Sequence, residues 1–178
     1  MPMIARLALM ACAAFLAVPA AAFAAEPSAV MYKVTPEGNG DLAGLITITA
    51  SPAGSVFHLN LKGLPPGPHG FHVHENGDCG PVTENGKPVP AGAAGGHWDP
   101  GRTGKHEGPS GNGHTGDLPV LEVAKDSIAI KNLTAPRIKD MESLRGHALI
   151  IHAGNDNFSD RPAPLGGGGA RIACGVIK

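Results

Sequence analysis

A short histidine-bearing segment, residues 71–74, constrains the fold of this chain more than any other stretch. Its sequence, Phe-His-Val-His, alternates apolar residues with histidines. On a β-strand, alternate side chains point to the same face, so Phe71 and Val73 share one face while His72 and His74 share the other. Adjacent neutral imidazoles on one face suit copper or zinc. A strand with two surface histidines is the alternative, but the chain has nine histidines, several of them in Gly-rich segments downstream, which favours a metal site.

The composition favours short strands joined by many turns. The 178 residues include 26 Gly and 17 Pro, and only 4% are aromatic. This suits one domain of strands and turns more than a helical bundle. A net charge of −1 implies no polyanionic partner. Because few aromatic side chains are present for base stacking, we also predict no nucleic-acid binding.

Residues 1–24 have the features of a secretory signal peptide. Arg6 supplies a positive start, residues 7–18 form a short apolar run, and the Ala-Phe-Ala sequence at 22–24 matches the small-x-small cleavage pattern. A transmembrane anchor is the alternative, but the run is shorter than the roughly 20 apolar residues that a bilayer requires. A lipoprotein signal cleaved before Cys12 is a second alternative.

Cysteine usage agrees with export. Cys12 would leave with the signal, and the mature domain, residues 25–178, keeps Cys79 and Cys174. In an oxidising compartment these two cysteines make one candidate disulfide pair. Thiolate ligation of copper is not expected, because the pair would consume both thiols. We therefore predict an exported, periplasmic domain that contacts no membrane after signal removal.

The mature chain is predicted to be all-β. Apolar alternation bounded by Gly, Pro, Asn and Asp indicates eight short strands. Besides the histidine strand, they cover residues 29–35, 42–50, 55–64, 118–123, 127–133, 147–152 and 170–177. No periodic pattern holds over 77–116 or over 154–169, and connections of this length are usually functional. The predicted fold is an eight-stranded antiparallel Greek-key sandwich, or flattened barrel, with two long functional loops.

Five segments carry the candidate metal ligands. They are residues 72–74, 96–100, 105–108, 113–117 and 151–153, which add His97, His106, His114, Asp117 and His152 to the histidines of the strand. Asp117 follows His114 by three residues, which favours zinc over the alternative of solvated loop histidines. His58 stands alone on a strand and is interpreted as solvated. His69 and His147 have the opposite strand parity from the ligands and are interpreted as structural.

Five motifs make the sequence similar to a known family. They are Gly70-Phe71-His72-Val73-His74, Gly104-Lys105-His106, Gly116-Asp117-Leu118-Pro119, Asp156-Asn157-Phe158-Ser159-Asp160 and residues 169–177. On these motifs, in this order, the chain resembles the copper/zinc superoxide dismutases, and most of all their exported bacterial branch. The resemblance covers essentially the whole mature chain. It implies an antioxidant oxidoreductase that converts superoxide to dioxygen and hydrogen peroxide by cycling Cu(II) and Cu(I).

The resemblance also implies two metal sites. Carried over residue by residue, one copper ion would be held by His72, His74, His97 and His152, and one zinc ion by His97, His106, His114 and Asp117. His97 would bridge the two metals and would take up and release a proton during the cycle. The ligand types agree with this division. Four imidazoles suit Cu(II), whereas three imidazoles and a carboxylate close a tetrahedral zinc site.

Outside the ligands, the resemblance assigns three further roles. Asp156 would link a copper histidine to a zinc histidine, with an ordinary turn residue as the alternative. Arg171 would attract and orient superoxide, with a strand-end salt bridge as the alternative. The glycines at 166–169 would let Arg171 approach the site closely. Cys79 and Cys174 would form the intrasubunit disulfide.

Steering, assembly and turnover stay open at this level. The second long loop, over 156–171, contains no lysine, so Arg102, Lys105 and Arg161 are only candidates for steering superoxide. The bacterial branch includes monomers and dimers, so a homodimer is one of two outcomes. A periplasmic copper- and zinc-binding module without turnover is the rival function, against which the full ligand set and Arg171 argue. A structural domain with incidental histidines is a weaker rival.

Overall fold

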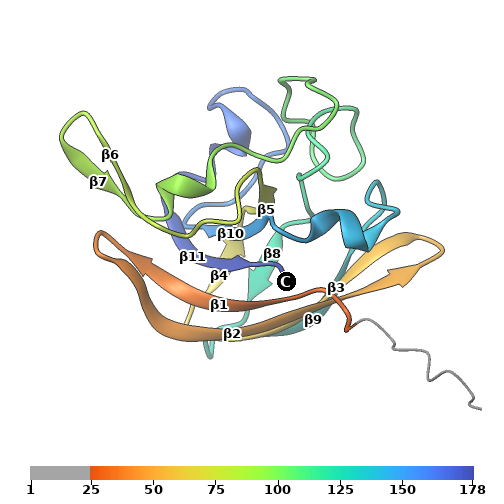
Figure 1. Cartoon of the computed structure of the whole chain (residues 1–178), viewed down its shortest axis with the longest axis horizontal. Helices are drawn as coiled ribbons and strands as arrows, with labels where there is room; N and C mark the ends of the chain where they lie inside the picture. Colours follow the sequence, from red (N-terminus) through yellow and green to blue (C-terminus); the bar gives the residue numbers. More distant parts are fainter. Residues whose placement is uncertain (1–24) are drawn as a thin grey trace, which may run out of the picture.

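One antiparallel sheet of seven strands carries the fold of the described residues, 25–178 (Figure 1). In this computed structural model the spatial order is β5 (Phe71–His74), β10 (Ala148–His152), β11 (Arg171–Val176), β1 (Ser28–Thr35), β2 (Gly38–Ser51), β3 (Gly54–Lys62) and β9 (Ile128–Ala135). The sheet curls, so that β5, β10 and β11 form a layer above β1, β2, β3 and β9. The predicted signal peptide, residues 1–24, lies outside the described residues.

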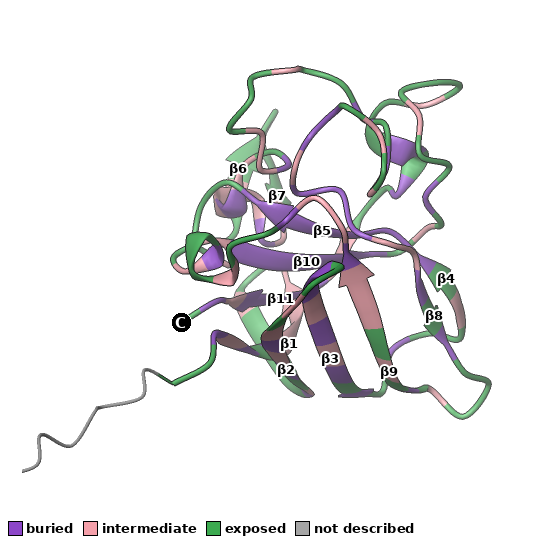
Figure 2. Ribbon diagram, turned by 90° about the vertical axis from the view of Figure 1, so that its right-hand side faces the viewer, coloured by how far each residue is buried: buried purple, intermediate pink, exposed green. Residues whose placement is uncertain are grey.

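Shorter elements complete the described part of the chain. They are the ladder β4 (Gly67–His69) with β8 (Leu121–Val123), the hairpin β6 (Val82–Glu84) with β7 (Lys87–Val89), and the 3₁₀ helices η1 (Gly92–Ala94), η2 (Met141–Leu144) and η3 (Leu165–Gly167). The β4–β8 ladder lies at one side of the sandwich (Figure 2). Within residues 25–178, no helix is both long and apolar enough to cross a bilayer.

Strand β5 is buried on both of its faces, as Figure 2 shows for it and for β10. Phe71 and Val73 enter the core between the layers, where the ring of Phe71 meets Phe57 of β3 edge to face at 5.9 Å. Burial of such a side chain stabilises the fold by about 1.5–3 kcal/mol relative to exposure. His72 and His74 occupy the other face and are 0% and 1% exposed, because the long loops cover them. The alternation in the sequence thus places Phe71 and Val73 on the core face of β5 and His72 and His74 on the face covered by the loops.

The all-β sandwich is confirmed, and all eight predicted strands occur with shifted ends. The number eight is too low, because β4, β6 and β7 bring the described strands to eleven. Residues 77–116, which show no periodic pattern in the sequence, nevertheless contain β6, β7 and η1. The turn between β6 and β7 is formed by Asn85 and Gly86, at φ of 51° and 75°. Asn-Gly is the strongest two-residue hairpin signal, but strands of three residues show no alternation to reveal it.

Candidate metal centre

Two loop segments pair with the free edge of β5, and this pairing positions their side chains. The Val73 N–H donates to Gly116 O at 2.9 Å, and the Trp98 N–H donates to Val73 O at 2.8 Å. A third bond, of 2.8 Å from Gly116 N to Trp98 O, joins the two segments to each other. Backbone hydrogen bonds alone therefore hold the residues that flank Trp98 and Gly116 against β5.

Four histidines meet on the loop-facing side of β5 and β10. They are His72, His74, His97 and His152, all buried, and one ring nitrogen from each lies within 4.8 Å of the others. His97 reaches this group because its backbone bridges to His74. The rings of His72 and His97 stack with their centroids 3.9 Å apart. The residues that the sequence assigned to copper thus form one compact group, which we call the four-histidine group.

A second group shares His97 with the first. It contains His97, His106, His114 and Asp117, whose ligand atoms also lie within 4.8 Å of one another. Three Nδ1 atoms approach Oδ1 of Asp117, at 3.0 Å from His97, 3.0 Å from His106 and 3.5 Å from His114. Because His97 uses Nδ1 on this side, its Nε2 is left for the four-histidine group. We call this second set the carboxylate group.

Four buried ring nitrogens in these groups make no well-directed hydrogen bond within the described residues, although two of them lie 3.0 and 3.5 Å from Oδ1 of Asp117. They are Nδ1 of His72, Nε2 of His97, Nδ1 of His106 and Nδ1 of His114. A buried polar atom left without a partner costs about 1–3 kcal/mol. A cation in each group would give all four atoms a partner, and imidazole and carboxylate are suitable ligands for copper and zinc. The residues present therefore fit two metal ions.

The protonation of the histidines agrees with this fit. Burial lowers the pKa of His72 to about 3 and that of His152 to about 4, so both rings are neutral at pH 7. Neutral imidazole is the form that binds metals. Burial also opposes charge on His106, but the carboxylates of Asp117 and Asp156 outweigh it and raise the pKa of His106 to about 9. The carboxylate group thus attracts positive charge where a cation would bind.

Asp156 connects the two groups through the outer ring nitrogens of one histidine from each. It is 4% exposed, and its Oδ2 lies 2.7 Å from Nε2 of His72 while its Oδ1 lies 2.8 Å from Nε2 of His106. Gly166, at φ of 73°, packs on this contact, and a Cβ there would lie only 2.1 Å from Oδ1 of Asp156. Glycine is therefore required at 166. Both metal-facing rings are oriented by one carboxylate, a common arrangement around bound metals.

Arg171 lies beside the four-histidine group. Its Nη2 donates to Gly95 O at 2.6 Å, and its Nη1 donates to the carbonyl oxygen of Ala91. Gly95 O also accepts from Nδ1 of His74 at 2.9 Å, so one carbonyl holds both the arginine and a histidine of the group. No ion pair involves Arg171 within residues 25–178, which removes the strand-end salt bridge as an explanation for it.

Comparison with known proteins assigns the family. Residues 42–177 match the family model for copper/zinc superoxide dismutase. The chain belongs to the copper/zinc superoxide dismutase family. The Cu-Zn superoxide dismutase 2 of Salmonella typhimurium is 55% identical over 159 residues, which are 89% of this chain and 92% of that protein. The Cu-Zn enzyme of Escherichia coli K12 is 52% identical over 163 residues, or 92% of this chain and 94% of that protein.

Solved structures agree with the family assignment. The Cu/Zn superoxide dismutase from Brucella abortus superposes with a TM-score of 0.84 at 49% sequence identity. The match covers 86% of this chain and 100% of that chain. The solution structure of the monomeric copper, zinc superoxide dismutase from Salmonella enterica gives 0.76 at 54% identity, covering 85% and 98%. The resemblance found in the sequence is therefore confirmed at the level of family and fold.

Three histidines of this dismutase-family chain stay outside the two groups. His58 is half-buried, with its ring 2.8 Å from Thr49 Oγ1 and 2.9 Å from Asn132 Oδ1, so it is held on the sheet rather than free in solvent. The ring of His69 contacts two backbone carbonyls, at 2.7 and 2.8 Å. His147 contacts one backbone carbonyl, at 2.7 Å. All three connect segments of the fold, and none contributes a ligand atom to either group.

Asp160 has a role that the sequence did not reveal. Its Oδ2 accepts from the His106 N–H at 2.9 Å, and its Oδ1 accepts from the Leu165 N–H at 3.1 Å. These two donors lower the pKa of Asp160. The residue thus ties the second long loop to the backbone of a member of the carboxylate group. Its only signal was its place in the motif that begins at Asp156, which does not distinguish it from its neighbours.

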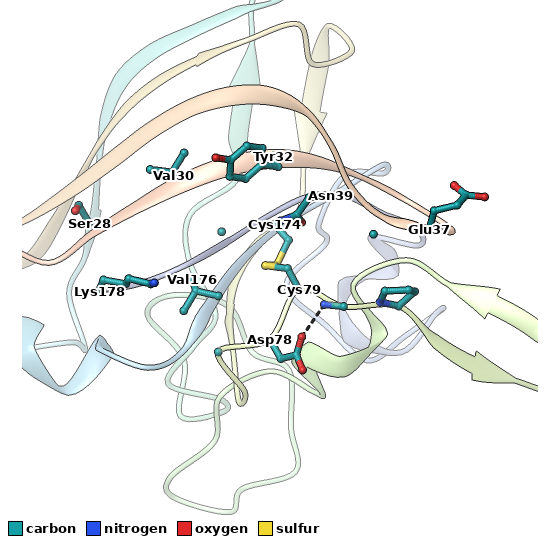
Figure 3. Close-up of a pocket in the computed structure, with 15 residues that line it drawn as sticks. Ser28, Val30, Tyr32, Glu37, Asn39, Asp78, Cys79, Cys174, Val176 and Lys178 are labelled. Carbon is teal, nitrogen blue, oxygen red and sulfur yellow. Dashed lines mark hydrogen bonds between the residues drawn. A yellow bond between two sulfur atoms is a disulfide. The ribbon is translucent and has the colours of Figure 1, made fainter.

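A disulfide joins Cys79, in the loop after β5, to Cys174 of β11, with Cα atoms 5.8 Å apart. It lies in the wall of a hollow of about 740 Å³ that Val30 and Tyr32 of β1 also line (Figure 3). No member of the two histidine groups lines this hollow, so we place the chemistry at the histidines instead. Cys79 and Cys174 pack with Ala91, whose carbonyl holds Arg171. The disulfide therefore anchors the loop that holds the arginine.

Breaking this disulfide should destabilise the protein. A cross-link that closes a loop with a sequence separation of 95 residues removes much conformational freedom from the unfolded chain, and loss of a native disulfide typically costs about 2–5 kcal/mol. We expect a lower free energy of unfolding after reduction, measured by denaturant titration of the oxidised and reduced forms. The Cys79→Ser/Cys174→Ser double variant should match the reduced form. Two free thiols in the native, air-oxidised mature protein would contradict the pairing.

Proposed function

We propose that this chain converts two superoxide anions and two protons to one dioxygen and one hydrogen peroxide. The observation that carries the proposal is the position of His97, which belongs both to the four-histidine group and to the carboxylate group. An imidazole with a cation at each nitrogen loses its second proton, and it regains a proton when one of those contacts is released. His97 is therefore equipped to hold and deliver a proton at the reacting centre.

In this proposal the four-histidine group holds one copper ion and the carboxylate group holds one zinc ion. When bound, copper supplies one-electron redox chemistry between Cu(II) and Cu(I), and zinc supplies a fixed positive charge beside His97. The assignment is supported by donor type, since four imidazoles suit copper and three imidazoles with one carboxylate suit zinc. Asp156 orients His72 and His106 through their outer nitrogens, which keeps Nδ1 of each ring directed inward.

Protons and charge are handled by two residues of the chain. His97 would carry one proton on Nε2 between the two half-reactions and would give it to the second superoxide, while solvent would supply the second proton, so that hydrogen peroxide leaves. Arg171 would attract each superoxide by its charge and orient it with its planar donors. Two carbonyls, of Ala91 and Gly95, hold the guanidinium beside the four-histidine group, which supports this role.

Metal content and superoxide consumption of one preparation test the function. We expect both metals to survive dialysis and the rate of superoxide consumption to rise in proportion to copper content. Retention of both metals without superoxide consumption would indicate a metal carrier instead. Loss of both metals during dialysis would indicate a structural domain with incidental histidines.

We also propose that the protein acts in the periplasm, after removal of residues 1–24. The charged start, the short apolar run and the Ala-Phe-Ala sequence at 22–24 support export, and the disulfide between Cys79 and Cys174 suits an oxidising compartment. N-terminal sequencing of the protein from a periplasmic extract should therefore begin near Ala25. An intact Met1 terminus in the exported fraction would contradict this.

A homodimer and a monomer are the two outcomes that the sequence leaves open for this chain. A solved relative from Salmonella enterica is described as monomeric, which is a statement about that protein. Sedimentation analysis of the mature chain, residues 25–178, over a range of concentrations distinguishes the two. A single species with the mass of one chain at all concentrations would identify a monomer, and a species of twice that mass would identify a homodimer.

A further inference from the structure

Arg137 hydrogen-bonds to the turn that carries two members of the carboxylate group. Its Nη1 donates to His114 O at 3.0 Å, and its Nη2 donates to Gly113 O at 2.8 Å. His114 O also accepts a longer bond, of 3.4 Å, from the Asp117 N–H. This bond closes a turn with His114 at one end and Asp117 at the other. The guanidinium therefore holds the carbonyl on which the turn closes.

The backbone around Arg137 is fixed to the sheet on both sides. Ala135 is the buried last residue of β9 and is paired with Ser55 of β3. Ile138 is 2% exposed, and its carbonyl accepts from both the N–H and the Oγ of Ser55, at 2.8 and 2.9 Å. Arg137 thus projects from a segment tied to the core. Its hydrogen bonds to the turn therefore fix the His114–Asp117 turn relative to the sheet.

His114 needs such support more than the other histidines. In four of them the outer ring nitrogen has a protein partner: Asp156 for His72 and for His106, Gly95 O for His74, and Gly169 O for His152. His97 is enclosed between the two groups. Among residues 25–178, His114 alone of the six has no hydrogen bond to its ring. Its side chain is also the most exposed of the carboxylate group, at 9%.

The backbone must therefore orient His114. On one side the His114 N–H donates to Lys105 O at 2.8 Å, and Gly113 lies so close to Lys105 that a Cβ would sit 2.2 Å from the same oxygen. On the other side, Arg137 supplies the two donors for the carbonyls of Gly113 and His114. Arginine suits this position, because its planar fork reaches two acceptors at once and offers no lone pair that could bind a metal.

We propose that Arg137 is a positioning residue for zinc, which fixes the His114–Asp117 turn in the geometry that binds the ion. The inference rests on the proposed function, because it requires His114 and Asp117 to hold zinc. It assigns Arg137 no contact with substrate or metal. Its effect is on how long and how tightly zinc is held, and not on the four-histidine group.

Zinc competition with a chelator, on the full mature protein, tests the proposal. Substitution of residues that support metal ligands typically costs 10–100-fold in affinity, so Arg137→Ala should bind zinc about 10–100-fold more weakly. Copper retention should stay at the wild-type level. Arg137→Lys keeps the charge but can reach only one carbonyl well, so we expect a smaller loss of zinc affinity. With cobalt(II) in place of zinc, Arg137→Ala should also alter the visible absorption bands, which report ligand geometry.

Lys139→Ala is the matched control. Lys139 lies two residues further on and donates to Ala53 O at 3.2 Å, away from both groups, so its loss should leave zinc affinity unchanged. Wild-type zinc affinity and cobalt spectra in both Arg137 variants would overturn the proposal. Should Arg137→Ala not fold, Arg137→Lys decides the question on the same two measurements.

A double variant separates this inference from the proposed function. In a His114→Ala background, Arg137→Ala should cause a smaller further loss of zinc affinity than it causes in the wild type, because of the two ligands on the turn only Asp117 is left to be positioned. Additive losses would overturn the inference, since Arg137 would then act elsewhere. If His114→Ala alone leaves zinc affinity unchanged, the zinc assignment in the proposed function is wrong, and this inference fails with it.

Discussion

Replacing His97 with alanine should reduce superoxide consumption by about 10²–10⁴-fold, the contribution typical of a residue that transfers a proton in the reacting centre. The same change should weaken zinc retention and alter the copper absorption and resonance spectra. All three effects are expected together, because Nδ1 of His97 faces the carboxylate group while its Nε2 has no other partner. Activity, metal content and spectra of one preparation measure them.

His58→Ala is the control for loss of a buried or half-buried histidine. His58 is held by Thr49 and Asn132 on the sheet and belongs to neither metal group. The His58→Ala variant should therefore keep superoxide consumption and the content of both metals near the wild-type level. An unchanged copper spectrum in His97→Ala, with only zinc lost, would show that His97 is not shared between the metals.

Arg171→Ile should lower the rate of superoxide consumption by roughly one to two orders of magnitude while both metals stay bound. A cation a few ångströms from the docked anion is worth roughly 1–4 kcal/mol at effective dielectrics between those of water and a protein surface. Each 1.36 kcal/mol is about tenfold in rate. Arg171→Lys should lose less, because the charge survives although the planar fork does not. Pulse or stopped-flow measurement of superoxide decay checks both variants.

Salt dependence separates steering from a general loss of structure. Ions screen exposed charges, so the wild-type rate should fall as ionic strength rises, and Arg171→Ile should show a flatter dependence. Arg145→Ile removes an equal charge at a residue that is paired with Glu142, away from the metal groups, and serves as the control. Full activity with full copper in Arg171→Ile would show that this arginine does not dock superoxide.

Much of the fold could be predicted because its strands carry local signals. The alternation of Phe71 and Val73 with His72 and His74 predicted β5 and the face that each side chain takes. The hairpin β6–β7 could not be predicted in the same way, because three residues on each side of Asn85 and Gly86 are too few to show a period. Strand recognition depends on length, and the elements that were missed are the short ones.

For the candidate site, the sequence identified the ligand types but not what holds them. His106, His114 and Asp117 could be named from residue type, spacing and family motifs. No local pattern indicates that Asp160 holds the His106 N–H, or that Arg137 holds the carbonyl of His114. These contacts join residues 54 and 23 positions apart, and such pairs depend on how distant loops pack together.

By itself, the sequence determined the fold class, the family and the set of candidate ligands, because strand alternation, motif order and ligand chemistry are local properties of the chain. Only the tertiary structure decided how those ligands are arranged around His97 and how Arg171 is held. The Gly95 carbonyl that binds Arg171 also binds His74, and it is placed there by a loop anchored through the disulfide between Cys79 and Cys174. The physical reason is that backbone carbonyls carry no residue identity, so their use as hydrogen-bond acceptors is set by packing alone.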